Sequence, residues 1–493
     1  MSETQKDIGR FFRHSGIYAL GNVLNRLGAF LLLPVYTHYL TVGEYGELEL
    51  FYVIAAVVSG LLSIGIAHAT LRFYFEYTEQ RDRDAVVTTN LIASFVITAC
   101  GVLPLAFWAE DIARYFFNDV GLAPGVWLIL AILVLELSSQ VSLAYLRAKE
   151  HSFFFVSVSF GKLIVQIAVN VVLLIWFNAG LLGVLTGNLS AVALGWLVLT
   201  GFTVRRCGRR FAWGKLIPVL KYSYPFLLST IVALVSTNVD RFLINSLLSL
   251  EALGLYALAT KFSRLLTDLI GEPFSRAYGA FRFTIMGQDD AAAIQARIVR
   301  YLFVTGCFAA LGLAYFIDAV LRVMSAPAYW EAAALVPILA LAGSLRLMIY
   351  PLETGILYGK DTRQIFYIRS VLAVFSTAVG LTLITWLGLA GACLTVLAAA
   401  VVEVALTNKI AQRYFQVTYE YSRLARILGL TVGFYLVSLP FEQLGLWPAF
   451  ALKWVLLALY VFVLTKAGVF EADEIAHARL FLGRGWRVLR ATT

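Results

Sequence analysis

Long apolar segments recur from one end of the chain to the other and decide which solvent it folds in. A helix needs about 20 residues to cross the hydrocarbon of a bilayer. Windows of this length start near residues 15, 48, 85, 124, 153, 179, 219, 252, 298, 331, 364, 389, 425 and 447. Runs this long exclude a membrane β-barrel, whose strands are about ten residues long and alternate in polarity. A chain that is 60% hydrophobic and 14% charged also has too much apolar surface for a soluble core. We predict an all-α polytopic membrane protein with 14 transmembrane helices.

The basic residues indicate how these helices are oriented. Thirty of the 39 Lys and Arg residues fall in the termini and in the loops on one side, whereas the other side holds only Arg114 and Arg322. Cytoplasmic loops accumulate Lys and Arg, so we predict that both termini are cytoplasmic. The same bias, together with anionic lipid, accounts for the net charge of +9, which therefore gives no support to a nucleic-acid partner.

An internal repeat organises the chain. Residues 14–51 align with residues 222–259 at a constant offset of 208, which places Gly46 on Gly254. Each copy holds six predicted spans, an even number, so the copies share one orientation and are related by an axis along the membrane normal. We predict two lobes facing each other across a central cavity, residues 1–208 and 209–423. Two further spans in 424–470 and a cytoplasmic tail in 471–493 follow. The competing explanation is that low-complexity apolar sequences align by chance.

An arginine lies near the middle of the first predicted span. Asn22 precedes Arg26 by one turn, and no acidic residue lies in the same span. A charge at bilayer depth costs at least about 2.5–3.5 kcal/mol and normally faces a partner or a wet cavity. We therefore predict that Arg26 and Asn22 line the central cavity as substrate ligands.

The eighth predicted span carries a row of charges. Lys261, Arg264, Asp268 and Glu272 fall on one narrow stripe of a helix that turns about 100° per residue. One interpretation is a cavity-lining stripe that binds a pyrophosphate, because the forked donors of arginine suit phosphate. The other is a neutral ladder in which Arg264 pairs with Asp268 and Lys261 pairs with Asp240.

Two further pairs of ionised residues lie within predicted spans. Glu136 in the fourth span and Lys162 in the fifth fall at equal depth, because the hairpin between them centres near Lys149. A structural ion pair is one interpretation of these two residues, and a polar face that contacts sugars is the other. Asp240 and Arg241, which are adjacent in the seventh span, are also ion-pair candidates.

The tenth span contributes one more candidate ligand. Arg346 is either a substrate ligand or the partner of Glu353 or Glu403, since its long side chain can reach the interface. Asp268, Glu272 and Glu403 are the candidate carboxylates for titration if a cation drives transport. The four cysteines have no paired spacing, so we expect no metal site and no cofactor.

Five stretches of sequence occur in a recognisable order. They are PVYTHYLTVGEYGELEL and RFYFEY in the first half, and YSYPFLLS, NVDRFLI and EALGLYALATKFSRLL in the second. Together they resemble the Wzx-type polysaccharide flippases, in the superfamily that also holds the lipid II flippase and the MATE exporters. The resemblance implies transport of an undecaprenyl-pyrophosphate-linked oligosaccharide from the cytoplasmic to the outer leaflet of a bacterial inner membrane. It implies alternating access, in the service of surface or exopolysaccharide biosynthesis.

The resemblance also suggests roles for particular parts of the chain. Arg26 matches an arginine of the first span that lines the cavity of the lipid II flippase. The last two spans correspond to helices that help to form a groove for the lipid tail. The implied partners are the lipid-linked oligosaccharide, membrane lipids and a polysaccharide polymerase or other export machinery.

A cation-coupled MATE-type exporter of drugs or metabolites is the alternative function. Exporters of cationic drugs need acidic groups in the cavity, whereas a pyrophosphate carrier needs Arg and Lys. The basic residues of the spans therefore favour the flippase. The sequence has no Walker, HExxH or GxSxG pattern and the predicted outer loops are short, so we expect a transporter and no enzyme.

Overall fold

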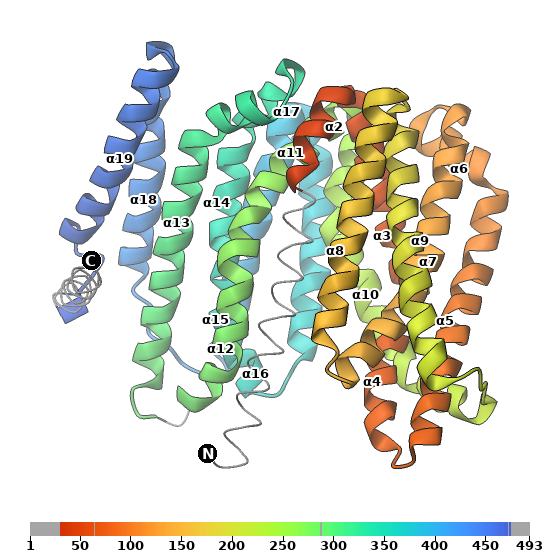
Figure 1. Cartoon of the computed structure of the whole chain (residues 1–493). Coiled ribbons are helices and arrows are strands. Elements are labelled where there is room, and N and C mark those ends of the chain that lie inside the picture. Colours follow the sequence, from red (N-terminus) through yellow and green to blue (C-terminus); the bar gives the residue numbers. More distant parts are fainter. Residues whose placement is uncertain (1–29, 64, 286–287, 472, 475–493) are drawn as a thin grey trace, which may run out of the picture. The chain divides into compact units, whose positions relative to one another are not determined.

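The chain is built from helices joined mostly by short turns (Figure 1). The computed structural model describes residues 30–63, 65–285, 288–471 and 473–474, and no strand occurs among them. The predicted all-α class is therefore confirmed for this part of the chain. The first predicted span, with Asn22 and Arg26, lies outside the described residues.

Two compact units divide the chain. One comprises Met1–Leu255 with Met324–Tyr329, and the other comprises Tyr256–Val323 with Trp330–Thr493. Helix α10 (Trp213–Leu247) belongs to the first unit because it packs against α3, α4 and α5 of that unit. The lobe boundary at residue 208 stays a prediction about the repeat, whereas the compact units are defined by packing.

The first unit follows the predicted spans in order. Its helices before α10 are α2 (Leu33–Tyr39), α3 (Val42–Leu62), α4 (Ile66–Glu76), α5 (Gln80–Phe107), α6 (Ala109–Phe117), α7 (Ala123–Ala148), α8 (Ser152–Val171) and α9 (Gly180–Cys207). Local chemistry sets their ends. Thr41 and Glu44 form a capping box at the start of α3, and Gly65 takes a left-handed φ of 73° before α4. Helix α7 packs against α3, α4, α5 and α9 and so lies at the centre of this unit.

The second unit begins within α11 (Leu250–Leu266). A π-helical turn, η3 (Thr267–Gly271), joins α11 to α12 (Glu272–Ile285). The remaining helices are α13 (Ala291–Met324), α14 (Val336–Leu347), α15 (Ile349–Leu352), α16 (Thr354–Tyr358), α17 (Arg363–Ala411), α18 (Tyr421–Ser438) and α19 (Leu446–Lys466). The short pieces α15 and α16 interrupt the tenth predicted span. Pro351 contributes to this interruption because proline has no backbone N–H to donate.

Helix α17 combines two predicted spans. Gly388 has φ 59° and ψ −134° inside it and divides it into two arms. The turn is tight, since a Cβ on Gly391 would lie 1.9 Å from the carbonyl oxygen of Leu383. Only glycine tolerates the left-handed conformation of Gly388 at little cost. The arms therefore run back against each other, which brings residues far apart in the sequence to the same level.

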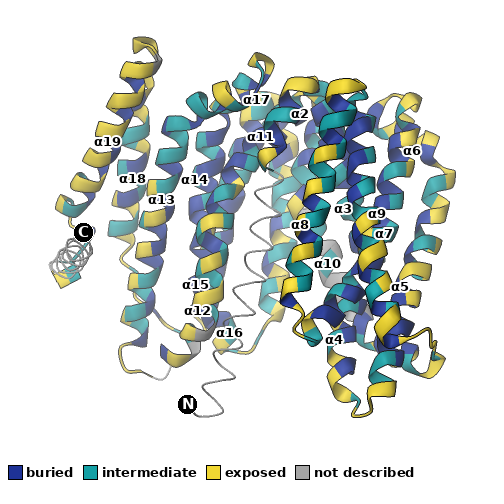
Figure 2. Cartoon of the chain, in the orientation of Figure 1, coloured by how far each residue is buried: buried dark blue, intermediate teal, exposed yellow. Residues whose placement is uncertain are grey.

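Ten helical segments of the described residues are long and apolar enough to cross a membrane. Helix α17 counts once among them although Gly388 divides it. The count of 14 spans stays a prediction, because the first of them is not described. Figure 2 shows that α18 and α19 carry many exposed residues. Apolar exposure on these helices, as at Leu436 and Trp454, is what contact with lipid tails requires.

The glycines that the repeat aligns lie against each other in the first unit. A Cβ on Gly46 of α3 would lie 1.8 Å from the carbonyl oxygen of Leu250. A Cβ on Gly254 of α11 would lie 2.2 Å from the carbonyl oxygen of Val42. Small residues let helix backbones approach closely in a membrane. This reciprocal contact is what a repeat axis passing between the two glycines requires, and the full repeat layout stays a prediction.

Candidate functional site

The candidate site is a cluster of charges that three helical segments of the second unit bring together. Glu403 lies on the second arm of α17, Arg369 on the first arm, and Arg346 at the end of α14. Arg346 Nε lies 3.4 Å from Glu403 Oε2. Arg369 Nη1 donates a hydrogen bond to Glu403 Oε1. Each carboxylate oxygen of Glu403 is thus paired with a different arginine.

The fold places these three residues at the same level. The tight turn at Gly388 sets the two arms of α17 antiparallel, so Arg369 and Glu403 face each other. Helix α14 packs against α17, which brings Arg346 to the same carboxylate. After α14 the chain continues as α15 and α16, with turns at Met348 and Glu353 whose backbone stays right-handed.

The arginines of the cluster are more exposed than the carboxylate that they share. Arg346 and Arg369 have 46% and 42% of their side chains exposed, whereas Glu403 has 3% exposed. Glu353 extends the cluster, since its Oε1 lies 3.9 Å from Arg369 Nη2 and its side chain is 26% exposed. The charge of Arg282 also acts on Glu353. The cluster therefore presents guanidinium groups on its open side and holds a carboxylate behind them.

The sequence offers two partners for Arg346, Glu353 and Glu403, and the structure pairs it with Glu403. Arg369 was missed, because it was counted with the basic residues of the 360–369 loop although the predicted span starts near residue 364. Helix α17 begins at Arg363, so Arg369 lies nearly two turns inside it. The sequence did contain a signal, since an apolar run surrounds Arg369. A charged residue inside a membrane span is costly and therefore marks a candidate site.

The charged row of the eighth span lies on two helices and the turn between them. Lys261 is half-buried and Arg264 exposed on α11, Asp268 lies in η3, and Glu272 begins α12. The predicted single stripe assumes an uninterrupted α-helix, and the π-helical turn breaks that assumption for Asp268 and Glu272. None of the four side chains is without a partner. Glu272 pairs with Arg276 at 3.4 Å.

The π-helical turn also packs close to the candidate site. A Cβ on Gly271 would lie 2.8 Å from the ring of Tyr350 and 2.9 Å from Leu347. These two residues flank the break between α14 and α15 that follows Arg346. The end of the charged row is thus held against the same interrupted segment that carries Arg346.

The candidates of the first unit have local partners. Arg241 is buried, and its Nη1 lies 3.4 Å from the Thr237 carbonyl oxygen and 3.7 Å from Asp240 Oδ1. Glu136 is exposed on α7, while the stem of Lys162 lies along Gly195 of α9. Among the described residues no ion pair joins Glu136 to Lys162.

The polar face of α8 bonds to neighbouring helices instead. Gln166 donates to Asn188 of α9 at 2.8 Å. Asn170 donates to the hydroxyl of Tyr36 of α2 at 2.6 Å. Interhelical amide bonds of this kind stabilise helix association in a membrane. Within the described part of the chain, no group of three or more His, Cys, Asp or Glu side chains is arranged to hold a metal ion.

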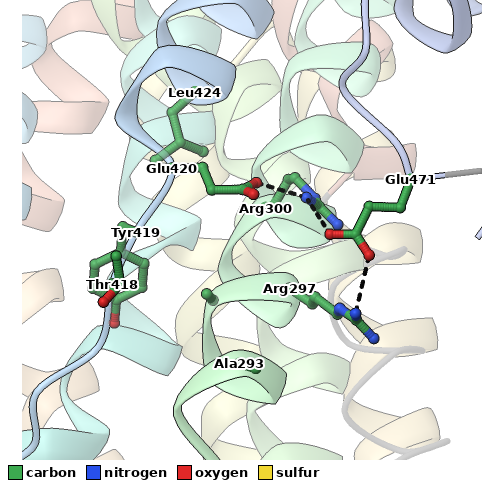
Figure 3. A pocket seen from close by; sticks show the side chains of 9 residues that line it. Ala293, Arg297, Arg300, Thr418, Tyr419, Glu420, Leu424 and Glu471 are labelled. Carbon is green, nitrogen blue, oxygen red and sulfur yellow. Dashed lines mark hydrogen bonds and ion pairs between the residues drawn. The ribbon is translucent and has the colours of Figure 1, made fainter.

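A second charged cluster lies where the start of α13 meets the C-terminal strap, which we define as residues 467–471 and 473–474. Figure 3 shows Arg297 and Arg300 pointing toward carboxylates from two other segments. Arg297 lies 3.0 Å from Glu471, and Arg300 lies 2.8 Å from Glu420. Arg300 also pairs with Glu474. Beside these groups is a cavity of about 150 Å³, lined by Ala293, Ala296, Arg297, Arg300, Thr418, Tyr419, Glu420, Leu424 and Glu471.

The strap carboxylate Glu474 has a perturbed pKa. Burial acts to raise it, but hydrogen bonds from the Tyr301 hydroxyl and the Glu471 backbone N–H and the charges of Arg300 and Arg297 outweigh burial. The pKa of Glu474 is therefore lowered below its usual value. The acid is ionised in the folded protein near neutral pH and fixes the strap to α13.

Comparison with known proteins supplies the family. The profile of the family described as "Polysaccharide biosynthesis protein" matches residues 37–334. The solved structure of the lipid II flippase MurJ, in an inward closed conformation, is similar with a TM-score of 0.74 and 13% identity, covering 91% of this chain and 98% of that chain. No protein with a curated function matches.

Transporters of the MATE family are similar over a smaller share of the chain. An inward-facing multidrug resistance MATE transporter of the MOP superfamily has a TM-score of 0.57 and 14% identity, covering 85% of this chain and 95% of that chain. A mutant of the Vibrio cholerae MATE transporter VcmN has a TM-score of 0.54 and 13% identity, covering 82% and 97%. Identities this low show the fold alone. The predicted resemblance is confirmed: the chain belongs to the polysaccharide biosynthesis protein family, and its fold is that of MurJ and the MATE transporters.

Proposed function

We propose that this protein is a flippase that moves an undecaprenyl-pyrophosphate-linked oligosaccharide from the cytoplasmic to the outer leaflet of a bacterial inner membrane. The observation that carries the proposal is the pair of half-exposed arginines, Arg346 and Arg369, held on one buried carboxylate within membrane-spanning helices. Transport of this kind moves the substrate unchanged, so the site needs ligands for a headgroup and no catalytic groups.

The chemistry of the two arginines suits a pyrophosphate. Guanidinium groups bind phosphate through two parallel N–H donors, and such charge-assisted hydrogen bonds contribute about 1.5–3 kcal/mol each. An arginine at membrane depth normally faces a partner or a wet cavity. Arg346 and Arg369 share a partner and keep close to half of each side chain accessible. They are therefore available to an anion that reaches the cluster.

The fold supports the same substrate class. The lipid II flippase matches 91% of the chain with a TM-score of 0.74, against 85% and 0.57 for a MATE transporter. That flippase is named for a lipid substrate, and we extend this substrate class to this chain as part of the proposal. Membrane lipids and a polysaccharide polymerase or export complex are the proposed partners. The cytoplasmic placement of both termini belongs to the proposal as well.

Further ligands are proposed from the sequence. Arg26 and Asn22 lie outside the described residues, and we retain them as proposed ligands on the strength of the resemblance. Lys261 and Arg264 lie on α11 within the second unit, with the Arg264 side chain exposed. A pyrophosphate needs several charge-assisted donors, so Arg346 and Arg369 act with these groups in the proposal.

A cation-coupled exporter of the MATE type is the second candidate function. Glu353 and Glu403 lie on membrane-spanning helices of a fold shared with MATE transporters. Acidic groups there would suit a cationic drug. The arginines cover the more buried of these carboxylates, Glu403, so the accessible side of the cluster is cationic. This distribution favours the anionic substrate.

The test is a flipping assay on purified protein in proteoliposomes. A fluorescent undecaprenyl-pyrophosphate oligosaccharide is added, and the fraction reached by an impermeant quencher is followed with time. Wild-type protein should flip the lipid, and Arg346→Ala with Arg369→Ala should slow flipping about tenfold or more, since charge-assisted bonds are lost. The variant with Arg346→Lys and Arg369→Lys keeps both positive charges but removes the forked N–H donors of guanidinium, so it tests the contribution of those donors alone. The matched control is Arg322→Ala, whose partner is Asp318 in the same helix.

One outcome contradicts the role of the two arginines, and another contradicts the flippase. The first is flipping by the double alanine variant at the wild-type rate, in protein that elutes as a single folded species. The other is no flipping by any form together with wild-type efflux of a cationic dye such as ethidium. The second outcome would establish the exporter.

A further inference from the structure

We propose that Glu403 is a resident counter-ion that competes with the substrate's phosphate for Arg346 and Arg369, and so keeps binding weak enough for release. This inference rests on the proposed function, because it concerns how the same site is regulated. Glu403, which the sequence offers as a coupling carboxylate or as a partner of Arg346, thereby gains a positioning and affinity-setting role.

The geometry makes Glu403 a fixed competitor. Its side chain is 3% exposed on the second arm of α17, and its two oxygens each hold one arginine. A carboxylate and a phosphate present similar oxygens to a guanidinium. The buried acid thus occupies the donors that a phosphate would take.

The charge balance sets the strength of that competition. Arg346 and Arg369 carry two positive charges, and Glu403 contacts both of them. An arriving phosphate must therefore share the arginines with a carboxylate already in contact. Glu353 is the weaker competitor, because its contact with Arg369 is 3.9 Å long.

Weak binding is useful to a carrier. Interactions that hold the substrate equally in every state of the cycle deepen the bound state and slow the steps that follow it. A lipid-linked pyrophosphate held by two uncompensated arginines would leave slowly. A resident carboxylate re-forms its ion pairs with the arginines as the phosphate departs, and these ion pairs favour release of the substrate.

The proposal predicts opposite changes in affinity and rate. Glu403→Gln removes the competing charge but keeps an oxygen that accepts a hydrogen bond. The affinity of detergent-solubilised protein for inorganic pyrophosphate, measured by calorimetry, should rise about tenfold. In proteoliposomes the half-saturating concentration of lipid substrate should fall, and the maximal flipping rate should fall severalfold. Glu353→Gln should change both quantities in the same directions by less.

A merely structural role predicts a different pattern. Loss of packing would lower the folded yield, the affinity and the rate together. The matched control is Asp318→Asn, since Asp318 pairs with Arg322 at 2.8 Å in an exposed contact and should leave both quantities unchanged. The role of Glu403 is overturned if Glu403→Gln binds pyrophosphate no more tightly than wild type, or if its maximal rate does not fall.

The measurements also separate this inference from the proposed function. Wild-type flipping with an unchanged pyrophosphate affinity in Glu403→Gln would reject the counter-ion and leave the flippase standing. Tighter pyrophosphate binding by Glu403→Gln, in a protein that flips no lipid in any form, would support the competition at the arginines and reject the flippase.

Discussion

At the scale of single residues, Arg300 shows how the C-terminal strap is tied to the membrane helices. Its side chain is 5% exposed at the start of α13 and pairs with Glu420 and Glu474. Glu420 precedes α18, and Glu474 belongs to the C-terminal strap. Val469 of the strap is fully buried, and Phe470 stacks on Tyr301 with ring centroids 6.4 Å apart. Helices α18 and α19 are thus held by ion pairs in addition to apolar packing, which has little driving force between helices in lipid.

Removal of one strap carboxylate tests this attachment. Glu474→Gln should lower the melting temperature of the purified protein, because a nearly buried arginine loses one of its charged partners, at a cost of about 1–3 kcal/mol. The exposed Glu331 provides the matched control as Glu331→Gln. Equal melting temperatures for Glu474→Gln and Glu331→Gln would show that the strap pairs do not stabilise the fold.

The lowered pKa of Glu474 predicts how the stability of the protein depends on pH. This pKa is lowered in the folded protein, so the folded state binds the proton less readily than the unfolded state. The stabilisation is therefore present above the unfolded pKa of about 4.3 and is lost as the pH falls through the lowered folded value. The melting-temperature difference between wild type and Glu474→Gln should be constant from pH 6 to 8 and should shrink below about pH 4. A difference that grows on acidification contradicts the sign.

At the scale of helices, close backbone contacts replace side-chain interlocking at one point of the first unit. Gly46 of α3 and Gly254 of α11 each lie where a Cβ would meet a backbone carbonyl oxygen, at 1.8 Å and 2.2 Å. A backbone atom cannot move aside as the end of a side chain can. The contact therefore needs glycine at both positions.

Larger residues at these glycines should prevent the helices from meeting. Gly46→Leu and Gly254→Leu should each destabilise the protein by about 1–3 kcal/mol or more through overpacking, seen as loss of monodisperse protein on size exclusion. Gly161→Leu is the control, because nothing lies within 4 Å of a Cβ at that helical glycine. Similar yields for Gly46→Leu and Gly161→Leu would contradict the close contact.

At the scale of the whole molecule, the bias of basic residues predicts the topology. Arg205, Arg206, Arg209 and Arg210 surround the end of α9, whereas the turn between α10 and α11 has no Lys or Arg. Lys and Arg are retained on the cytoplasmic side during insertion. One helix, α10, separates these two connections, so they must lie on opposite sides if α10 spans the membrane.

Reporter fusions measure this directly. A fluorescent protein that folds only in the cytoplasm should be active after Gly208, and a phosphatase that needs export should be active after Ser249. A phosphatase signal after Gly208 would reverse the proposed orientation. Activity of the same reporter at both positions would show that α10 does not cross the membrane.

The sequence by itself determined the solvent, the helical class and the family. Each of these depends on properties that a single segment carries, such as the length of an apolar run, its turn residues and the order of short motifs. The two predicted spans on either side of Gly388 illustrate this, since they are the two arms of α17. The sequence also identified Arg346 and Glu403 as ionised residues inside spans, because their cost in lipid marks them wherever they point.

Only the tertiary structure decided which charges meet. Arg346 pairs with Glu403, and Arg369, which was counted with the basic residues of a loop, joins them from the first arm of α17. The row of charged residues on the predicted eighth span is divided by a π-helical turn, which the hydrophobic periodicity of the sequence does not predict. An ion pair between helices depends on the rotation, depth and register of both, and hydropathy specifies none of these. The packing of α14 on the two arms of α17 sets all three at once.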